Sequence, residues 1–513
     1  MYRSIVFFVS LVAFSAAQAA WVKEEKLWEM NFTPGEMRGL EKGLVKGNHY
    51  AQEEGKDGAL FCVSTNDVGT RNFTMPLDVS RIAGPVLVEA RVKGVGIEHG
   101  ESPACGPNLM IYYVNPPGSR KRTAWRKLAG EFGTFDWKTW TLVDVIPSDV
   151  SDLSMVVTLQ HCRGELWVDD ISIWRAKEVP DDDVRPPESN PAADAIPRGR
   201  WAGRSRPGAF RGVMSGRDLS EDAFRTLWSW GANLIRLQIN VPSDGLETDE
   251  DYLHALSNRL NQTEIHVDLC RRYGIKACID LHGGPRTART KHASNVIPAN
   301  YDTLLLRRSW RMIATRFCGN PVVYGYDVLN EPSCPAATWQ RVFEEVVADI
   351  RAIDSETPVI TESLAKCYPP EMNVIYSPHF YSPHCLTHYG VGTQWKIRWS
   401  YLNYINGVWW NKDQLRVAMK DVIDFSFEHP DARIYIGEFS CIAWVKNADV
   451  YINDCIELFN EYGWDWTYHA FREWQPWDVE MEPVELYDTD VGHLRRAKED
   501  TPRKKALLRG LMR

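Results

Sequence analysis

From residue 200 onward, short apolar runs alternate with longer stretches of helical character. The apolar runs fall at 209–214, 233–239, 275–281, 322–329, 358–361, 373–381, 433–438 and 464–471. Helices are expected between most of them, as at 339–353 and 412–427, and Ser220 and Thr501-Pro502 are suited to begin helices. Eight strands that alternate with helices over roughly 310 residues predict a (β/α)8 barrel, the TIM-barrel form of the α/β class, at 200–513.

The pattern is different before residue 177. Residues 21–176 contain short alternating runs broken by Gly, Pro and Asn, at 86–92, 109–114, 140–145, 154–159 and 166–174. Such spacing predicts an antiparallel β-sandwich. Residues 177–199 contain three consecutive aspartates and five prolines but few apolar residues. We therefore expect this segment to be a linker between the sandwich and the barrel.

Residues 1–19 have the features of a secretory signal peptide, namely Arg3, an apolar stretch at 5–14 and the small-residue pattern Ala17-Gln18-Ala19. They predict a secreted or periplasmic protein. No later stretch approaches 18 uninterrupted apolar residues, so the sequence predicts no membrane span. The eleven cysteines are odd in number and lack CxxC spacing, so at least one thiol should be free.

Charge argues against nucleic acid as a partner. The formal net charge is −9, and the one dense basic cluster, at 503–513, falls on the expected last helix. A solvated helix face explains this cluster better than phosphate binding, which needs a basic stripe.

Two glutamates follow expected strands. Glu331 belongs to Asn330-Glu331-Pro332 at the end of the fourth run, and Glu438 ends the seventh. In a (β/α)8 barrel the active site collects at the C-terminal ends of the strands, so the two carboxyls should meet there. Glycosidic bond cleavage needs such a pair, because one carboxyl protonates the leaving oxygen while the other attacks C1 or activates water.

Other unusual polar residues fall at the same end of the expected barrel: Arg236 in the second run, His282 after the third, and His379 and Tyr381 in the sixth. In this order and on these strands, the residues resemble the glycoside hydrolase family 5 enzymes of the cellulase superfamily, clan A. The resemblance covers about residues 200–513. It implies that Glu331 is the general acid/base and Glu438 the nucleophile.

The resemblance also implies supporting roles. Asn330 would hold the sugar 2-hydroxyl, Arg236 and Tyr381 would orient the nucleophile, and His282 and His379 would line the same subsite. Family members usually place a tryptophan near strand eight as a platform for the sugar. The stretch at 464–474 offers Trp466, His469 or Trp474 for this role, and we favour Trp474.

Elementary electrostatics supports these roles. A retaining mechanism requires carboxyls roughly 5–5.5 Å apart, which strand ends across a small barrel permit. We expect Glu331 to be protonated when substrate binds, because partial desolvation beside a negative Glu438 would raise its pKa. We expect the cationic Arg236 to keep Glu438 ionised.

The expected activity is that of a retaining β-glycoside hydrolase acting on a β-linked polysaccharide or oligosaccharide, with β-1,4-glucan favoured and β-mannan next. The alternative is a non-catalytic glycan-binding protein on a hydrolase scaffold. An esterase is disfavoured because no Gly-x-Ser-x-Gly elbow occurs. Hydrolysis by two carboxyls requires no cofactor and no metal ion, and the sequence does not specify an oligomeric state. The run at 166–174 resembles the last strand of carbohydrate-binding-module-like jelly rolls, although a sandwich that only packs against the barrel fits it almost as well.

Overall fold

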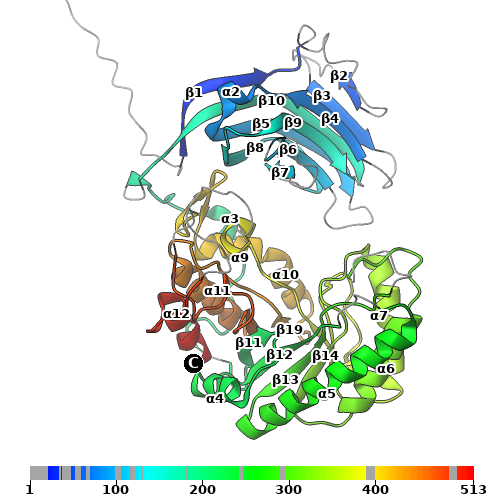
Figure 1. Cartoon of the computed structure of the whole chain (residues 1–513). Helices are drawn as coiled ribbons and strands as arrows, with labels where there is room; N and C mark the ends of the chain where they lie inside the picture. Colours follow the sequence, from blue (N-terminus) through cyan, green and yellow to red (C-terminus); the bar gives the residue numbers. More distant parts are fainter. Residues whose placement is uncertain are drawn as a thin grey trace, which may run out of the picture.

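The computed structural model describes residues 21–33, 36, 48–51, 59–64, 70–98, 106–115, 117, 123–128, 131–160, 162–180, 183–204, 206–241, 246–287, 295–388, 399–484 and 494–512. The expected signal peptide at 1–19 lies outside these residues. Antiparallel sheets from the N-terminal part of the chain lie above a barrel formed by the C-terminal part (Figure 1).

The N-terminal part contains two antiparallel sheets. One has the order β2-β3-β10-β5-β8, with β1 also paired to β10, and the other has the order β4-β9-β6-β7. The strands are β1 (Trp21–Met30), β2 (Asn48–Ala51), β3 (Ala59–Ser64), β4 (Thr70–Pro76), β5 (Gly84–Glu98), β6 (Gly106–Val114), β7 (Thr123–Lys127), β8 (Gly133–Ile146), β9 (Ser151–Gln160) and β10 (Arg163–Glu178), with the short helix α2 (Val79–Ile82) between β4 and β5. The antiparallel strands predicted from the alternating pattern are thus confirmed.

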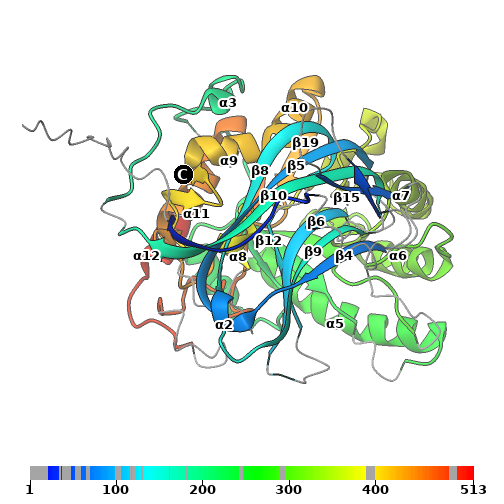
Figure 2. The ribbon, with the colours of Figure 1, turned by 90° about the horizontal axis from the view of Figure 1, so that it is seen from above.

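Successive side chains of β5 point to opposite faces of the sheet, and the two faces contact different cores. Val86 and Val88 are fully buried in the core shared by the two sheets. Leu87, between them, belongs with Val143 of β8 to the apolar core of the barrel part. The six-stranded sheet therefore contacts the barrel through its outer face, and Figure 2 shows β5, β8 and β10 lying over the barrel.

The segment expected to be a linker, 177–199, packs against the barrel where the structure describes it. β10 continues to Glu178, and the short helix α3 (Pro191–Asp194) follows. Asn190, just before α3, donates a hydrogen bond to the side-chain oxygen of Gln414 at 3.1 Å. Ile196 is buried in the barrel core.

The predicted barrel is confirmed as a closed ring of parallel strands in the order β11-β12-β13-β14-β15-β16-β19-β20. These strands are β11 (Arg211–Ser215), β12 (Leu234–Ile239), β13 (Lys276–Leu281), β14 (Val323–Asp327), β15 (Val359–Thr361), β16 (Val374–Tyr376), β19 (Arg433–Ile436) and β20 (Asp465–His469). Each lies within the apolar run that predicted it or extends one residue beyond it. The sixth is much shorter than its run at 373–381, so His379 and Tyr381 lie beyond its end.

Helices surround the ring. They are α4 (Glu221–Ser229), α5 (Asp249–Tyr273), α6 (Leu304–Phe317), α7 (Ala336–Arg351), α8 (His384–Thr387), α9 (Lys412–Ala418), α10 (Lys420–Glu428), α11 (Ala448–Tyr462) and α12 (Pro502–Leu511). The segment between β15 and β16 contains the 3-10 turn η3 (Pro370–Met372), and a hairpin of β17 (Asn403–Ile405) and β18 (Val408–Trp410) follows α8.

One of the two predicted helix starts has the expected side-chain cap and the other does not. Thr501 caps α12 by accepting a hydrogen bond from the backbone of Lys504, and Pro502 is its first residue. Ser220 occupies the N-cap position of α4 but makes no side-chain capping bond. The helix expected at 412–427 is divided in two at Met419.

The barrel interior has an apolar layer and an ionic layer. Leu234 of β12 belongs to an interior cluster with Tyr324, Tyr435 and three other residues of the strands. Arg236 is two residues further along β12, so its side chain also points inward, but nearer the C-terminal ends of the strands. The apolar layer thus forms a floor beneath the polar residues of the barrel mouth.

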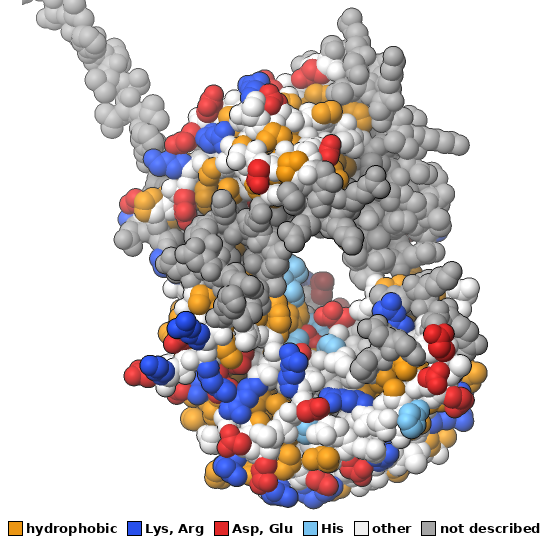
Figure 3. All heavy atoms as spheres, viewed as in Figure 1, with side chains coloured by type: hydrophobic (Ala, Val, Ile, Leu, Met, Phe, Trp, Pro, Cys, Tyr) orange, Lys and Arg blue, Asp and Glu red, His pale blue; other side chains and the backbone are white. Residues whose placement is uncertain are grey.

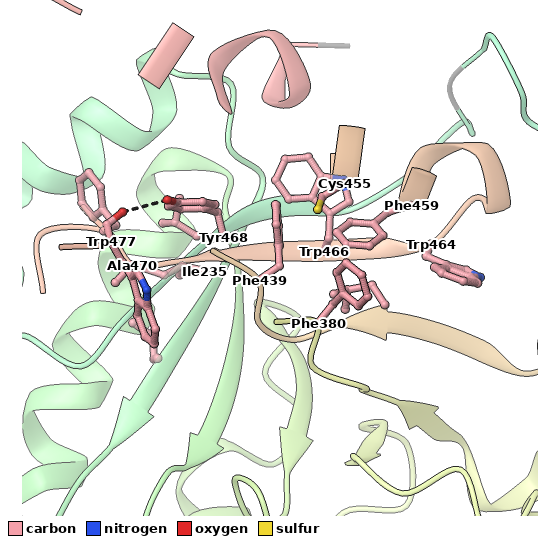
Figure 4. Packing of buried hydrophobic residues seen from close by; sticks show 14 of the residues in the cluster. Ile235, Phe380, Phe439, Cys455, Phe459, Trp464, Trp466, Tyr468, Ala470 and Trp477 are labelled. Carbon is pink, nitrogen blue, oxygen red and sulfur yellow. Dashed lines mark hydrogen bonds between the residues drawn. The ribbon is translucent and has the colours of Figure 1, made fainter. Parts of the chain in front are cut away.

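Aromatic packing outside the ring fixes the strands that carry Glu438 and His469. Phe439 contacts Phe459 of α11 and Trp466 of β20 edge-on, with ring centroids 5.1 and 5.7 Å apart (Figure 4). Phe439 and Phe459 are fully buried. The residue next to Glu438 is therefore anchored in the core, which restricts the position of the carboxyl.

Cysteines whose side chains are described, nine in all, are free thiols. Cys270 and Cys278 are fully buried. Among the described helices, none combines the length and hydrophobicity needed to cross a bilayer.

Candidate active site

Glu438 lies two residues beyond β19 and is only 3% exposed. Its Oε1 accepts a hydrogen bond from Arg236 Nη1 at 2.5 Å, and its Oε2 accepts one from the Tyr381 hydroxyl at 2.6 Å. Burial alone would raise the pKa of Glu438, but His379, His469 and Arg236 together hold it well below its usual range. Glu438 is therefore ionised at neutral pH, as expected beside Arg236.

Arg236 is the centre of a buried ionic cluster. The side chain is fully buried, and its Nε donates to Asp327 Oδ2 at 2.9 Å. Its Nη2 donates to Asn330 Oδ1 at 3.0 Å and lies 3.3 Å from Asp280 Oδ1. Burial raises the pKa of Asp327 to about 6, although Arg236 opposes this shift. The arrangement fixes Asn330 and Glu438 relative to one guanidinium.

Sequence reasoning missed Asp280 and Asp327, yet strand alternation could have found them. Asp280 is directly opposite Gln238, two residues beyond Arg236, and Asp327 is directly opposite Asp280. All these side chains therefore point into the barrel beside Arg236. A buried arginine requires carboxylate partners, and inward positions on the next two strands are where they had to be.

Glu331 follows Asn330 in a left-handed backbone conformation, with φ of 45°. Its side chain is half exposed at the barrel mouth. One Glu331 oxygen lies within 4.8 Å of a Glu438 oxygen, so the two carboxyls that the sequence singled out are brought together. This spacing is compatible with the roughly 5–5.5 Å between carboxyls in retaining enzymes.

In the free protein, Glu331 is not in the protonated state that is expected of it when substrate binds. Glu331 Oε1 accepts a hydrogen bond from His379 Nδ1 at 3.0 Å, and this bond lowers the pKa of Glu331 despite partial burial and the nearby Glu438. Desolvation and Glu438 act in the opposite direction, but His379, which follows another strand, outweighs them. Glu331 is thus ionised at neutral pH until something covers it.

His379 bridges three carboxyls. Besides Glu331, its Nδ1 lies 3.7 Å from Glu438 and its Nε2 lies 3.2 Å from Glu362. Burial disfavours the imidazolium, but Glu362 and Glu438 outweigh it and raise the pKa of His379 to about 9. Burial raises the pKa of Glu362 to about 8. Sequence reasoning missed Glu362, although it follows β15 directly, as Glu331 and Glu438 follow their own strands closely.

His282 is one contact removed from the glutamate pair. Its Nδ1 lies 2.8 Å from Asp280 Oδ2, and about a fifth of its side chain is exposed. Asp280 in turn contacts Arg236. His282 therefore lines the mouth through the ionic cluster, and no described contact joins it to Glu331 or Glu438 directly.

The three candidates for the sugar platform have different surroundings. Trp466 is fully buried in the core, so it is not available to a ligand. His469 contacts Glu438 through Nδ1 at 3.0 Å. Trp474 is half-buried and lines a cavity of about 540 Å³ next to His469, together with Gly216, Arg217, Asn240, His388, Glu473 and Trp477. The position of Trp474 suits the platform role, which stays a prediction.

The site as a whole lies where the barrel faces the N-terminal sheets. In the space-filling view, histidine and acidic side chains gather around a hollow on this side of the barrel (Figure 3). Donor atoms of Glu331, His379 and Glu438 all lie within 4.8 Å of one another, a spacing that could also hold a cation. The pKa of His379 is raised to about 9, so a cation bound here at neutral pH would have to displace the proton of His379.

Buried Glu438 beside half-exposed Glu331 at the mouth of a (β/α)8 barrel is the arrangement of a two-carboxyl glycosidase. The model of the family Cellulase (glycosyl hydrolase family 5) matches residues 202–473, more than half of the chain. The chain belongs to glycosyl hydrolase family 5.

Individual relatives are more distant. Cellodextrinase A of Ruminococcus flavefaciens is 25% identical over 192 residues, which is 34% of this chain and 54% of that protein. The chain thus spans about half the length of this relative. The match with a solved glycoside hydrolase covers 59% of this chain and 99% of that chain, at 19% identity and a TM-score of 0.47. Cel5A of Thermotoga maritima, solved with cellobiose, covers 59% and 97%, at 17% identity and a TM-score of 0.45.

Proposed function

We propose that this family 5 hydrolase cleaves β-linked glucan chains, of the β-1,4 type first and β-mannan next, with retention of anomeric configuration. The observation that carries the proposal is the spacing of Glu331 and Glu438, whose nearest oxygens lie within 4.8 Å. A larger gap would leave room for a water between sugar and carboxylate, as inverting enzymes need. Family membership and the cellodextrinase name of one relative support the choice of substrate.

In the proposed first step, Glu438 attacks C1 of the sugar while Glu331 gives its proton to the leaving oxygen. The C1–O bond to the leaving sugar breaks and an ester bond from C1 to Glu438 forms. In the second step, Glu331 takes a proton from a water whose oxygen attacks C1. The ester bond then breaks and Glu438 is again a carboxylate.

The other side chains divide between the two steps. Arg236 and Tyr381 bind one oxygen each of Glu438, which sets the direction in which the carboxylate faces C1. Asn330, fixed by Arg236, is placed to bind a sugar hydroxyl next to the reacting carbon. Glu331 must gain a proton before the first step, and a bound sugar that excludes water from its exposed side would raise its pKa.

Digestion of defined polysaccharides tests this proposal. The purified protein is incubated with soluble β-1,4-glucan, β-mannan and α-1,4-glucan, and product sizes are measured by chromatography, with Glu438→Gln as the matched inactive control. We expect shortened β-1,4-glucan, a lower rate on β-mannan and no cleavage of the α-linked polymer. Cleavage of α-1,4-glucan alone would overturn the substrate assignment, and binding of β-glucan without turnover would indicate the non-catalytic alternative.

We also propose that the protein is exported, on the strength of the leader-like residues 1–19. Expression of the full chain in a bacterial host, followed by N-terminal sequencing of the protein recovered from periplasm and medium, tests this. A mature chain that begins at Ala20 or Trp21 is expected. An uncut N-terminus on protein that stays in the cytoplasm would contradict export.

A further inference from the structure

His469 lies at the end of β20, on the side of Glu438 away from Arg236. Its Nδ1 lies 3.0 Å from Glu438 Oε2 and 3.0 Å from the Tyr381 hydroxyl, which itself donates to the same Oε2 at 2.6 Å. The His469 side chain is nine-tenths buried, and its ring packs against Trp477 with centroids 4.7 Å apart. These contacts leave the imidazole little freedom to rotate.

The second nitrogen of His469 faces another carboxylate. Nε2 lies 3.6 Å from Glu473 Oε2, and Glu473 is itself fixed. It accepts hydrogen bonds from the backbone of Gly216 at 3.0 Å and from Gln238 Nε2 at 3.1 Å. Since Glu473 is anchored to β12 and to the residue that follows β11, it provides a stationary negative charge behind the imidazole.

We propose that His469, backed by Glu473, is a positioning residue that orients the Glu438 carboxylate and stabilises its negative charge. The chain Glu473–His469–Glu438 gives an imidazolium a carboxylate at each nitrogen, so one N–H is directed at Glu438 Oε2. Arg236 binds the opposite oxygen. Glu438 is thereby held from both sides. The inference rests on the proposed role of Glu438 as nucleophile.

The charges around His469 agree with this arrangement. Burial alone would keep the imidazole neutral, but Glu438 and Glu473 raise the pKa of His469 to about 9. Burial would raise the pKa of Glu473, yet the imidazolium of His469, 3.6 Å away, lowers it. Other groups facing His469 are the Tyr381 hydroxyl from the segment after β16 and His388 after α8, whose own pKa is lowered to about 4 chiefly by burial. His388 is therefore uncharged and does not compete for Glu438.

Two variants distinguish a positioning role of His469 and Glu473 from a merely structural role. Glu473→Gln keeps an oxygen for Gly216 but removes the charge behind His469. We expect it to lower the pKa of His469, and to move the alkaline limb of kcat/KM on an activated aryl β-glycoside to lower pH by about one unit, a tenfold change in the protonated fraction. His469→Gln should lower kcat by about 10- to 100-fold with KM changed less. Exposed His254 on α5 supplies the matched control, His254→Gln.

The double variant His469→Gln/Glu473→Gln gives the sharpest result. If Glu473 acts through His469, the double variant should be as active as His469→Gln alone. Losses that multiply, or an alkaline limb that Glu473→Gln leaves in place, would overturn the proposal. NMR titration of ¹³C-labelled histidine in the wild type and Glu473→Gln, with the His469 signal assigned through His469→Gln, measures the same link without turnover. A protein that shows the shift but cleaves no glycan would sink the proposed function and leave the Glu473–His469 link standing.

Discussion

Replacement of Arg236 by methionine removes the one guanidinium that the buried carboxyls share. Arg236 is fully buried, and Asp327, Asp280 and Glu438 all lie within 3.3 Å of it. Breaking a buried ion pair by removing one partner costs about 3–5 kcal/mol, because an uncompensated charge remains. We expect Arg236→Met to lose this much stability at pH 8.

The stability lost in Arg236→Met should depend on pH, and the titration of Asp327 determines whether the loss grows or shrinks as pH rises. Its pKa is about 6 with Arg236 present, and without the guanidinium it must rise. A carboxyl with a raised pKa in the folded state destabilises the protein increasingly as pH rises above its pKa in the unfolded chain. Between pH 6 and pH 8, two pH units, Asp327 alone can account for up to about 3 kcal/mol, at about 1.4 kcal/mol per unit. At pH 5 the deficit should therefore be clearly smaller.

Thermal unfolding followed by circular dichroism at pH 5 and pH 8 measures both effects. For a domain of this size, about 2–4 °C of melting temperature corresponds to 1 kcal/mol, so we expect a drop of roughly 10 °C at pH 8. Arg225→Met is the control, because Arg225 forms an exposed pair with Asp222 at 3.4 Å, and such pairs contribute about 0–1 kcal/mol. A change under about 2 °C, or the same drop at both pH values, would refute the reasoning.

Three further predictions concern the reaction and its substrate. Glu331→Gln should lose about 10²- to 10⁴-fold on unactivated glucan but much less on a dinitrophenyl glycoside, measured by initial rates, and equal losses would count against an acid role. Early product from a β-linked substrate should be the β-anomer by proton NMR, with a fluorinated mechanism-based sugar attached to Glu438 by mass spectrometry; α-anomer would reassign Glu438. His379→Gln should raise the pKa of Glu331 and move the alkaline limb on unactivated glucan to higher pH, whereas a downward shift would contradict the hydrogen bond as the cause.

The fold could be predicted because both sheet types produce periodic patterns. Strands buried on both sides appear as short, mostly apolar runs, and every barrel strand was found within such a run. The sixth run was drawn too long because Phe380 and Tyr381 continue its aromatic character beyond Pro378. Ser377 donates its backbone hydrogen bond to Thr361 and Phe380 donates to Glu438, so the chain leaves the ladder without losing its backbone partners.

The sequence predicted which residues form the site, but it predicted their charge states only in part. Glu331, Glu438 and Tyr381 follow strand ends, Arg236 points into the ring from within β12, and closure of the ring brings these side chains together. The charge state of Glu331 depends instead on a hydrogen bond with His379, 48 residues away, whose geometry no local pattern encodes. Likewise, Glu473 follows the eighth strand among several polar residues, and only the three-dimensional structure shows that it faces His469.

The ionic layer of the barrel divides the site between two parts of the chain. Arg236, Asp280 and Asp327 come from the second, third and fourth strands, whereas Glu438 and His469 come from the seventh and eighth. Glu331 belongs to the first half of the ring and Glu438 to the second, so neither half alone contains both of the paired carboxyls. Closure of the ring and assembly of the catalytic charges are consequently a single event. Fragments split near residue 355 should regain activity only when they reassociate, which makes turnover a direct reporter of barrel closure.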